Sequence, residues 1–106
     1  MNYRNLTINE QTTYQDNVFE SVYLMITDLS INSYNEKKAQ VLFSLYKSKQ
    51  TAETHPEWAI NINEFDNITI TFVEGDVINR DTIAGGVKQA LCRMFPSWNP
   101  DKIVIE

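Results

Sequence analysis

Strict alternation of apolar and polar side chains is the feature that most restricts how this chain can fold. It is cleanest in residues 67–74, where Ile68, Ile70 and Phe72 alternate with Asn, Thr and Val. Successive side chains of a β-strand point to opposite faces of the sheet. The pattern therefore predicts a strand with one packed face and one face in water.

Two longer segments, residues 18–31 and 39–47, also alternate, and a polar turn region joins them. Strand, short polar connection and strand predict an antiparallel hairpin. Apolar side chains lie on both faces of the first strand, which predicts a central position in the sheet. Its apolar parity changes part-way, which predicts a β-bulge near Thr27 and Asp28.

A helix is predicted from a cap at Asn79 or Asp81 to Phe95, because Pro96 cannot continue it. The apolar stripe of this helix consists of Ile83, Val87, Ala90, Leu91 and Met94. The glycine pair at residues 85–86 costs about 1 kcal/mol per residue relative to Ala inside a helix. Either a close approach to the sheet offsets that cost, or the regular helix begins only after the pair.

Three shorter elements complete the predicted order: a helical turn over residues 48–53 capped by Ser48, a strand over 58–63 and a last strand over 103–105. Strands followed by a helix predict an α+β fold, with a mainly antiparallel sheet of four to five strands and one helix of the C-terminal half packed on it. We divide the chain into a polar N-terminal arm, residues 1–17, and a single α+β domain, residues 18–106.

The predicted arm is rich in Asn, Gln and Thr and has no sustained apolar period. It is either a disordered or edge-strand terminus, or an extended segment that becomes ordered against a neighbouring subunit. Its scattered apolar residues keep the second interpretation open.

Composition excludes several classes of function. The chain has 106 residues, 14 acidic and 9 basic, with a net charge of −5 and no basic cluster, which argues against direct nucleic-acid binding. Cys92 is the single cysteine, so no intrachain disulfide is expected. No segment approaches the roughly 20 apolar residues of a membrane-spanning helix, and no signal peptide is recognisable. We expect synthesis in the cytoplasm and no membrane association.

The sequence offers no catalytic, cofactor-binding or metal site that we would assign. One His and one Cys cannot supply the four ligands of structural zinc. Cys92 lies in the predicted helix as a packed thiol, and His55 lies in a polar connection without a visible partner. A carboxylate metal enzyme is the third-ranked possibility, and its candidate ligands are Asp66, Glu74, Asp76 and Asp81.

Aromatic side chains suggest contact surfaces instead. Tyr23 and Tyr46 lie on the less apolar faces of the two hairpin strands, with Met25 and Leu42 beside them. They form an exposed patch of the kind enriched at interfaces, unless the helix covers this face. With the arm and the hairpin loop included, the candidate interaction residues are Tyr3, Leu6, Ile8, Tyr14, Tyr23, Met25, Tyr34, Leu42 and Tyr46.

Residues 22–29 (VYLMITDL), 35–37 (NEK) and 41–49 (VLFSLYKSK) resemble small structural proteins of tailed bacteriophages, in which a hairpin ends in a Tyr-x-Ser-Lys run. The resemblance implies a tail, neck or baseplate subunit that self-associates and contacts neighbouring virion subunits. It brings no active-site residues. The alternative is a small acidic phage-encoded inhibitor or adaptor that binds a host protein.

Overall fold

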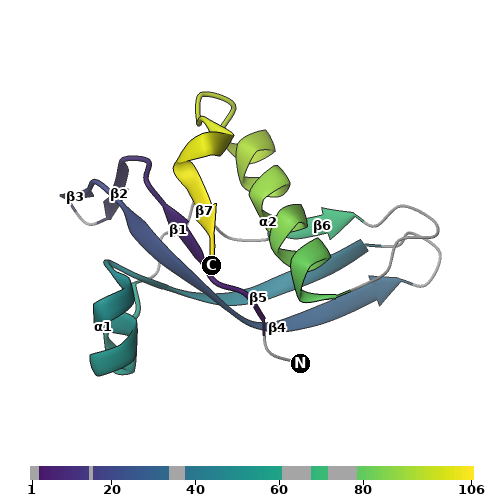
Figure 1. The fold of residues 1–106 in the computed structure, drawn as a ribbon, viewed down its shortest axis with the longest axis horizontal. Coiled ribbons are helices and arrows are strands. Elements are labelled where there is room, and N and C mark those ends of the chain that lie inside the picture. The colour runs from purple at the N-terminus through teal and green to yellow at the C-terminus, as the bar shows by residue number, and fades with distance from the viewer. Residues whose placement is uncertain (1–2, 15, 34–37, 61–67, 72–78) are drawn as a thin grey trace.

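A computed structural model describes residues 3–14, 16–33, 38–60, 68–71 and 79–106. Its main body is a five-stranded sheet with the helix α2 (Arg80–Met94) across one face (Figure 1). The sheet is antiparallel throughout and α2 lies in the C-terminal half of the chain. The predicted α+β class, with four to five strands and one packed helix, is confirmed.

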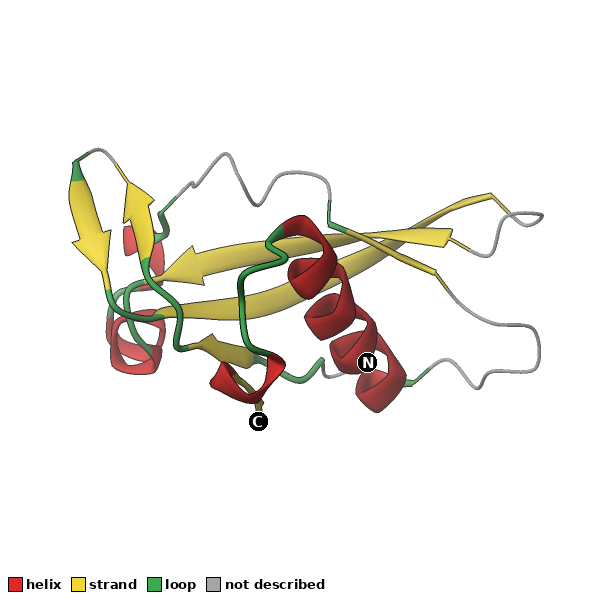
Figure 2. Cartoon of the chain, turned by 90° about the horizontal axis from the view of Figure 1, so that it is seen from above, coloured by secondary structure: helices red, strands yellow, loops and turns green. Residues whose placement is uncertain are grey.

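The strand order in the sheet is β6–β5–β4–β1–β7. The strands are β1 (Leu6–Ile8), β4 (Val22–Ser33), β5 (Lys38–Tyr46), β6 (Thr69–Thr71) and β7 (Ile103–Ile105). The predicted hairpin is β4–β5, the longest pair in the molecule (Figure 2). The pairing register shifts between Ile26 and Asp28, so the predicted bulge is confirmed at the predicted place.

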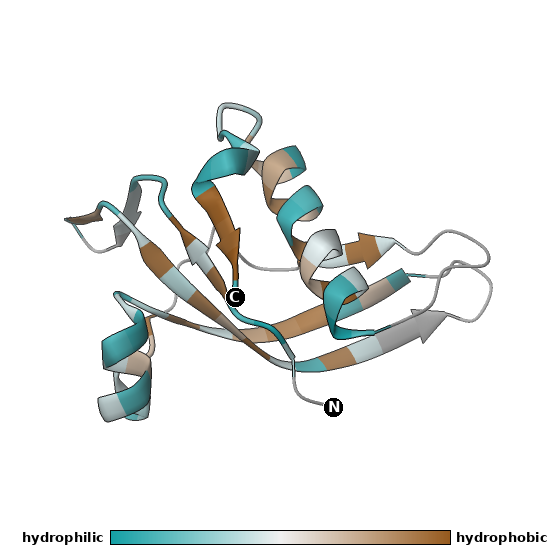
Figure 3. Cartoon of the chain, viewed as in Figure 1, coloured by the Kyte–Doolittle hydropathy of each residue, from teal (hydrophilic) through white to brown (hydrophobic). Residues whose placement is uncertain are grey.

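Hydrophobic and hydrophilic residues alternate along β4 and β5 (Figure 3). In a strand this alternation places one set of side chains on the face that α2 covers. This inner face carries Val22, Leu24 and Ile26 from β4 and Val41 and Leu45 from β5, all buried. The helix supplies the opposing layer of the core, namely Ile83, Ala84, Val87, Ala90 and Leu91. Ile68, just before β6, and Ile70 of β6 are buried on the sheet side of this core, as their alternation predicts. Phe72 lies outside the described residues.

The glycine pair lies inside α2, which begins at an Asn79 cap and ends at Phe95. A Cβ atom at Gly86 would lie 3.1 Å from Cγ2 of Ile70, whereas a Cβ atom at Gly85 would meet no atom within 4 Å. The first of the two predicted explanations therefore holds for Gly86: its missing side chain lets the helix lie close to the sheet.

The middle of the predicted N-terminal arm, β1, belongs to the five-stranded sheet. β1 pairs with β4 on one side and with β7 on the other, and Leu6 and Ile8 are 0% exposed. Assigning both to an arm that orders on a neighbouring subunit was therefore wrong. The physical reason is that the short apolar strands β1 and β7 bury their inward side chains only when they pair within the same sheet.

The remaining elements are small. β2 (Thr12–Tyr14) and β3 (Asn17–Phe19) form a separate two-stranded ribbon that the sequence analysis did not predict. The helix α1 (Lys49–Thr54) has the predicted Ser48 cap, and two 3-10 turns follow, η1 (Pro56–Trp58) and η3 (Pro100–Lys102).

The predicted strand over residues 58–63 is wrong at its start, because Trp58 belongs to η1. Ile60 makes a single antiparallel bridge to Leu45, and residues 61–63 lie outside the described part of the chain.

Candidate functional site: the outer face of the sheet

The face of the sheet opposite α2, here called the outer face, divides into a closed end and an open middle. Strand pairing aligns Val104, Thr7, Tyr23 and Tyr46 in one row across β7, β1, β4 and β5. In Figure 1 this end lies next to α1, while α2 occupies the opposite side of the sheet.

The two tyrosines are buried at the closed end, with 4% and 3% of their surfaces exposed for Tyr23 and Tyr46. The hydroxyl of Tyr46 donates a hydrogen bond to the carbonyl oxygen of Pro56 over 2.8 Å. The hydroxyl of Tyr23 donates to Oε2 of Glu106 over 2.9 Å, and Nζ of Lys49 lies 3.3 Å from Oε1 of the same carboxylate. The segment α1–η1 therefore closes this end.

The pKa of Tyr23 is raised to about 12. The main cause is burial of the phenol, followed by its hydrogen bond to the Glu106 carboxylate, and the negative charge of that carboxylate adds to the effect. The phenol therefore stays protonated and keeps donating to Glu106 at any neutral pH. Its role at this position is structural.

The middle of the outer face is open. Leu42 is 44% exposed. It pairs with Asp28 of β4 on one side, whereas the described pairing of β5 with β6 covers only Lys38 to Gln40. Met25, half-buried, lies opposite Ser44 and diagonally next to Leu42. We call this surface the outer patch; its outward-facing residues are Met25, Asp28, Ser30, Lys38, Gln40, Leu42 and Ser44.

The outer patch carries one charge of each sign. Asp28 pairs with Leu42 in the hairpin register, and its Oδ1 accepts a hydrogen bond from the backbone N–H of Leu29 over 2.8 Å. Lys38 lies at the other end of the patch. Both side chains are exposed, and within the described part of the chain neither forms an ion pair.

The predicted interaction residues fall into three groups. Leu42 and Met25 lie in the outer patch as predicted. Four others do not form an exposed patch, because they are buried: Leu6, Ile8, Tyr23 and Tyr46.

The third group consists of residues at the margins. Tyr3 is partly buried against the core. Tyr14 lies in β2, but its side chain is outside the description, as is the whole of Tyr34. Asp28 and Lys38, by contrast, were not among the candidates. The alternation of β4 and β5, combined with the hairpin register, contains the signal that places them on the open face.

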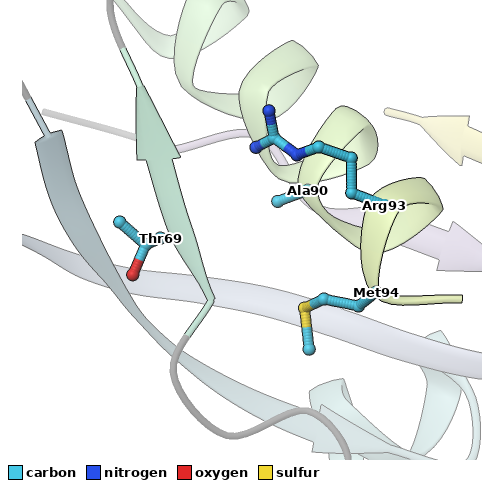
Figure 4. Close-up of a pocket in the computed structure, with 4 residues that line it drawn as sticks. All are labelled: Thr69, Ala90, Arg93 and Met94. Carbon is cyan, nitrogen blue, oxygen red and sulfur yellow. The ribbon is translucent and has the colours of Figure 1, made fainter.

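A small pocket lies at the end of α2. Figure 4 shows the pocket between Thr69 of β6 and the last turns of α2, which is lined by Ala90, Arg93 and Met94. Its volume is about 210 Å³, below the ~300–1,000 Å³ typical of ligand sites.

A larger groove of about 510 Å³ runs beside α2 and is lined by Gly85, Lys88, Gln89, Cys92, Arg93 and Pro100. Cys92 is partly exposed there. Neither a histidine nor a carboxylate is among the lining residues. The groove therefore brings no general base to the thiol.

The other candidates for chemistry are accounted for locally or lie outside the description. His55 stacks on Trp58 with ring centroids 3.7 Å apart, and its Nδ1 lies 3.3 Å from Oε1 of Glu57. Asp81 forms an ion pair with Arg4. Asp66, Glu74 and Asp76 lie outside the described residues. The described part of the chain contains no group of three or more potential metal ligands.

Comparisons of the chain with protein-family models, with curated proteins and with solved structures found no match. None of the described helices has the length and the apolar character needed to cross a membrane.

Proposed function

We propose that this protein is a non-enzymatic assembly subunit that works through protein–protein contacts at its outer patch. The observation that carries this proposal is the exposure of Leu42, 44%, on the face of the five-stranded sheet opposite α2. A large apolar side chain on a sheet is normally covered by a second layer, as the inner face is covered by α2.

The chemistry of the outer patch suits reversible binding of a protein surface. Leu42 and the neighbouring Met25 supply apolar area, and Gln40 and Ser44 supply hydrogen-bonding groups around it. Burial of apolar area contributes roughly 25 cal/mol per Å², and Met is enriched in interface cores. No residue of the outer patch lines either of the two pockets described above.

A virion role is the more specific part of this proposal. The segments that resemble phage structural proteins, residues 22–29 and 41–49, form most of the two strands that carry the outer patch. A tail, neck or baseplate subunit repeats the same contact around a symmetry axis. We infer that the outer patch makes one of these repeated contacts.

The test is the solution mass of the protein, measured by light scattering coupled to size exclusion over a range of concentrations. The wild-type chain is expected to self-associate, and Leu42→Arg is expected to be monomeric. Val18→Arg is the matched control, because Val18 is also exposed, at 54%, but lies on the separate β2–β3 ribbon.

A wild-type chain that stays monomeric at every concentration would contradict self-assembly and favour an inhibitor or adaptor that binds another protein. Equal losses of association in Leu42→Arg and Val18→Arg would contradict the assignment to the outer patch.

A further inference from the structure

We infer that the outer patch binds the outer patch of a second copy, face to face, about a two-fold axis that passes over Gln40. In this arrangement Lys38 of each copy meets Asp28 of the other. The inference rests on the proposed function and makes it more specific, because it names the partner and the register of the contact.

The spacing of the charges along the hairpin supports this register. Lys38, Gln40 and Leu42 are successive outward residues of β5, and Asp28 lies opposite Leu42 on β4. Outward residues follow one another at about 6.6 Å along a strand. The positive and the negative charge therefore lie one step away from Gln40, in opposite directions.

The two-fold axis lies between the two sheets and runs perpendicular to the strands at Gln40. Rotation about it reverses the strand direction and exchanges the position of Lys38 with the position of Leu42 and Asp28. Lys38 of one copy then lies over the row of Leu42 and Asp28 of the other. Its methylene groups cover the exposed Leu42 side chain, and its ammonium group reaches the Asp28 carboxylate. The symmetry produces the contact twice, since a two-fold interface is self-complementary. Sheets packed face to face lie about 10 Å apart, a gap that side chains from both faces fill.

The competing register places the axis over Leu42. It brings the two Leu42 side chains together, but it also brings the Asp28 carboxylates of both copies close to each other. Like charges in neighbouring positions across an interface are unfavourable. The charge pattern therefore favours the Gln40 register over the one that apolar contact alone would select.

Among the residues that the structure describes, neither Lys38 nor Asp28 has an ion-pair partner within its own copy. The ion pairs between described residues involve Arg4, Lys49 and His55, and none involves Lys38 or Asp28. Two outward steps separate Lys38 from the row of Asp28, roughly 13 Å. This exceeds the distance of a direct ion pair, so Lys38 and Asp28 do not pair with each other within one copy.

The experiment measures dimer dissociation constants by analytical ultracentrifugation for Asp28→Lys, for Lys38→Asp, for the double variant and for a 1:1 mixture of the two single variants. Each single variant replaces both intermolecular attractions by repulsions, so we expect about tenfold weaker dimers. The double variant exchanges the charges and should recover the wild-type affinity.

The mixture is the sharpest arm of the test. A mixed dimer contains one chain with two lysines and one with two aspartates at these positions, so both contacts are again attractive. We expect the mixture to dimerise about as tightly as the wild-type chain, whereas each single variant alone dimerises about tenfold more weakly. Glu20→Lys and Lys102→Asp are the controls, because they change the net charge equally at exposed residues outside the patch.

Two results would overturn the inference. The first is unchanged affinity in both single variants while Leu42→Arg is monomeric, which would leave the proposed function intact and reject the register. The second is a double variant and a mixture that remain as weak as the single variants. A wild-type chain that never dimerises would reject the proposed self-association as well, and the Leu42→Arg comparison detects that failure separately. Melting curves of all variants exclude unfolding as the cause.

Discussion

The two faces of the β4–β5 hairpin have the same backbone and opposite surroundings. On the inner face, Leu24 and Leu45 are buried beneath α2. On the outer face, the Tyr23–Tyr46 pair is closed by the segment α1–η1, whereas Leu42 remains open. The difference teaches that strand alternation assigns each residue to a face, while burial depends on which other elements reach that face.

Substituting one leucine on each face by alanine should give the largest difference between them. Leu24→Ala leaves a cavity in the core and is expected to lower the free energy of unfolding by about 2–5 kcal/mol. Leu42→Ala removes an exposed side chain of the same size and should cost less than about 0.5 kcal/mol in the monomer. Urea unfolding at low protein concentration measures both values. Similar losses at the two positions would mean that the outer patch is covered in the monomer.

The closed end of the outer face should respond to high pH. The pKa of Tyr23 is raised to about 12 in the folded chain from the ordinary tyrosine value of 10.0, so folding favours the protonated phenol. This contribution is complete below pH 10 and is lost as the pH rises towards 12. We expect a loss of about 1 kcal/mol between pH 9 and pH 11.

The measurement for this effect is urea unfolding across that pH range, for the wild-type chain and for Tyr23→Phe. The phenylalanine variant lacks the titrating group and should show a shallower decline. Parallel curves for the two proteins would show that Tyr23 is not held against Glu106.

The adjacent glycines of α2 test how closely the helix covers the inner face. Gly85→Ala places its Cβ in open space and should stabilise the chain by about 0.5–1 kcal/mol, because Ala favours the helix. At Gly86 the new Cβ would lie 3.1 Å from Cγ2 of Ile70, so crowding should cancel or reverse that gain. Thermal unfolding of both variants measures the difference. Equal stabilisation at both positions would mean that the helix can move away from β6 freely.

The smallest expected effect is the loss of stability when the N-cap of either covering helix, α1 or α2, is removed. Ser48 caps α1 through its side chain, which accepts a hydrogen bond from the backbone N–H of Thr51 over 3.1 Å. Asn79 caps α2 in the corresponding way. Each alanine substitution should cost about 0.5–1 kcal/mol. Hydrogen exchange should become faster in α1 for Ser48→Ala and in α2 for Asn79→Ala. Faster exchange in both helices for either variant would show that the two faces are covered cooperatively.

Local physics explains why much of the fold was predictable. The bulge near Thr27 and Asp28 is visible as a change of apolar parity, and it produces the register shift observed in β4. The limits of α2 follow from an Asn cap and a proline, and the Ser48 cap marks α1. These signals lie within a few residues of the structure that they determine.

The candidate site was predictable only in part. Leu42 and Met25 were correctly placed on the outward face, but Tyr23 and Tyr46 were not expected to be buried there. Their burial depends on Pro56 and Glu106, 10 and 83 positions away along the chain. The β2–β3 ribbon was missed because its strands are short and their apolar pattern is sparse.

The sequence by itself determined the alternating strands, their bulge, the helix with its cap and the α+β class, since each of these depends on neighbouring residues. Only the tertiary structure decided that β1 pairs between β4 and β7 and that α1–η1 closes one end of the outer face. It also decided that Leu42 stays open beside Asp28, with Lys38 two outward positions away on the same strand. The physical reason is that burial and strand partnership are properties of segments distant in the chain, whose meeting no local pattern encodes.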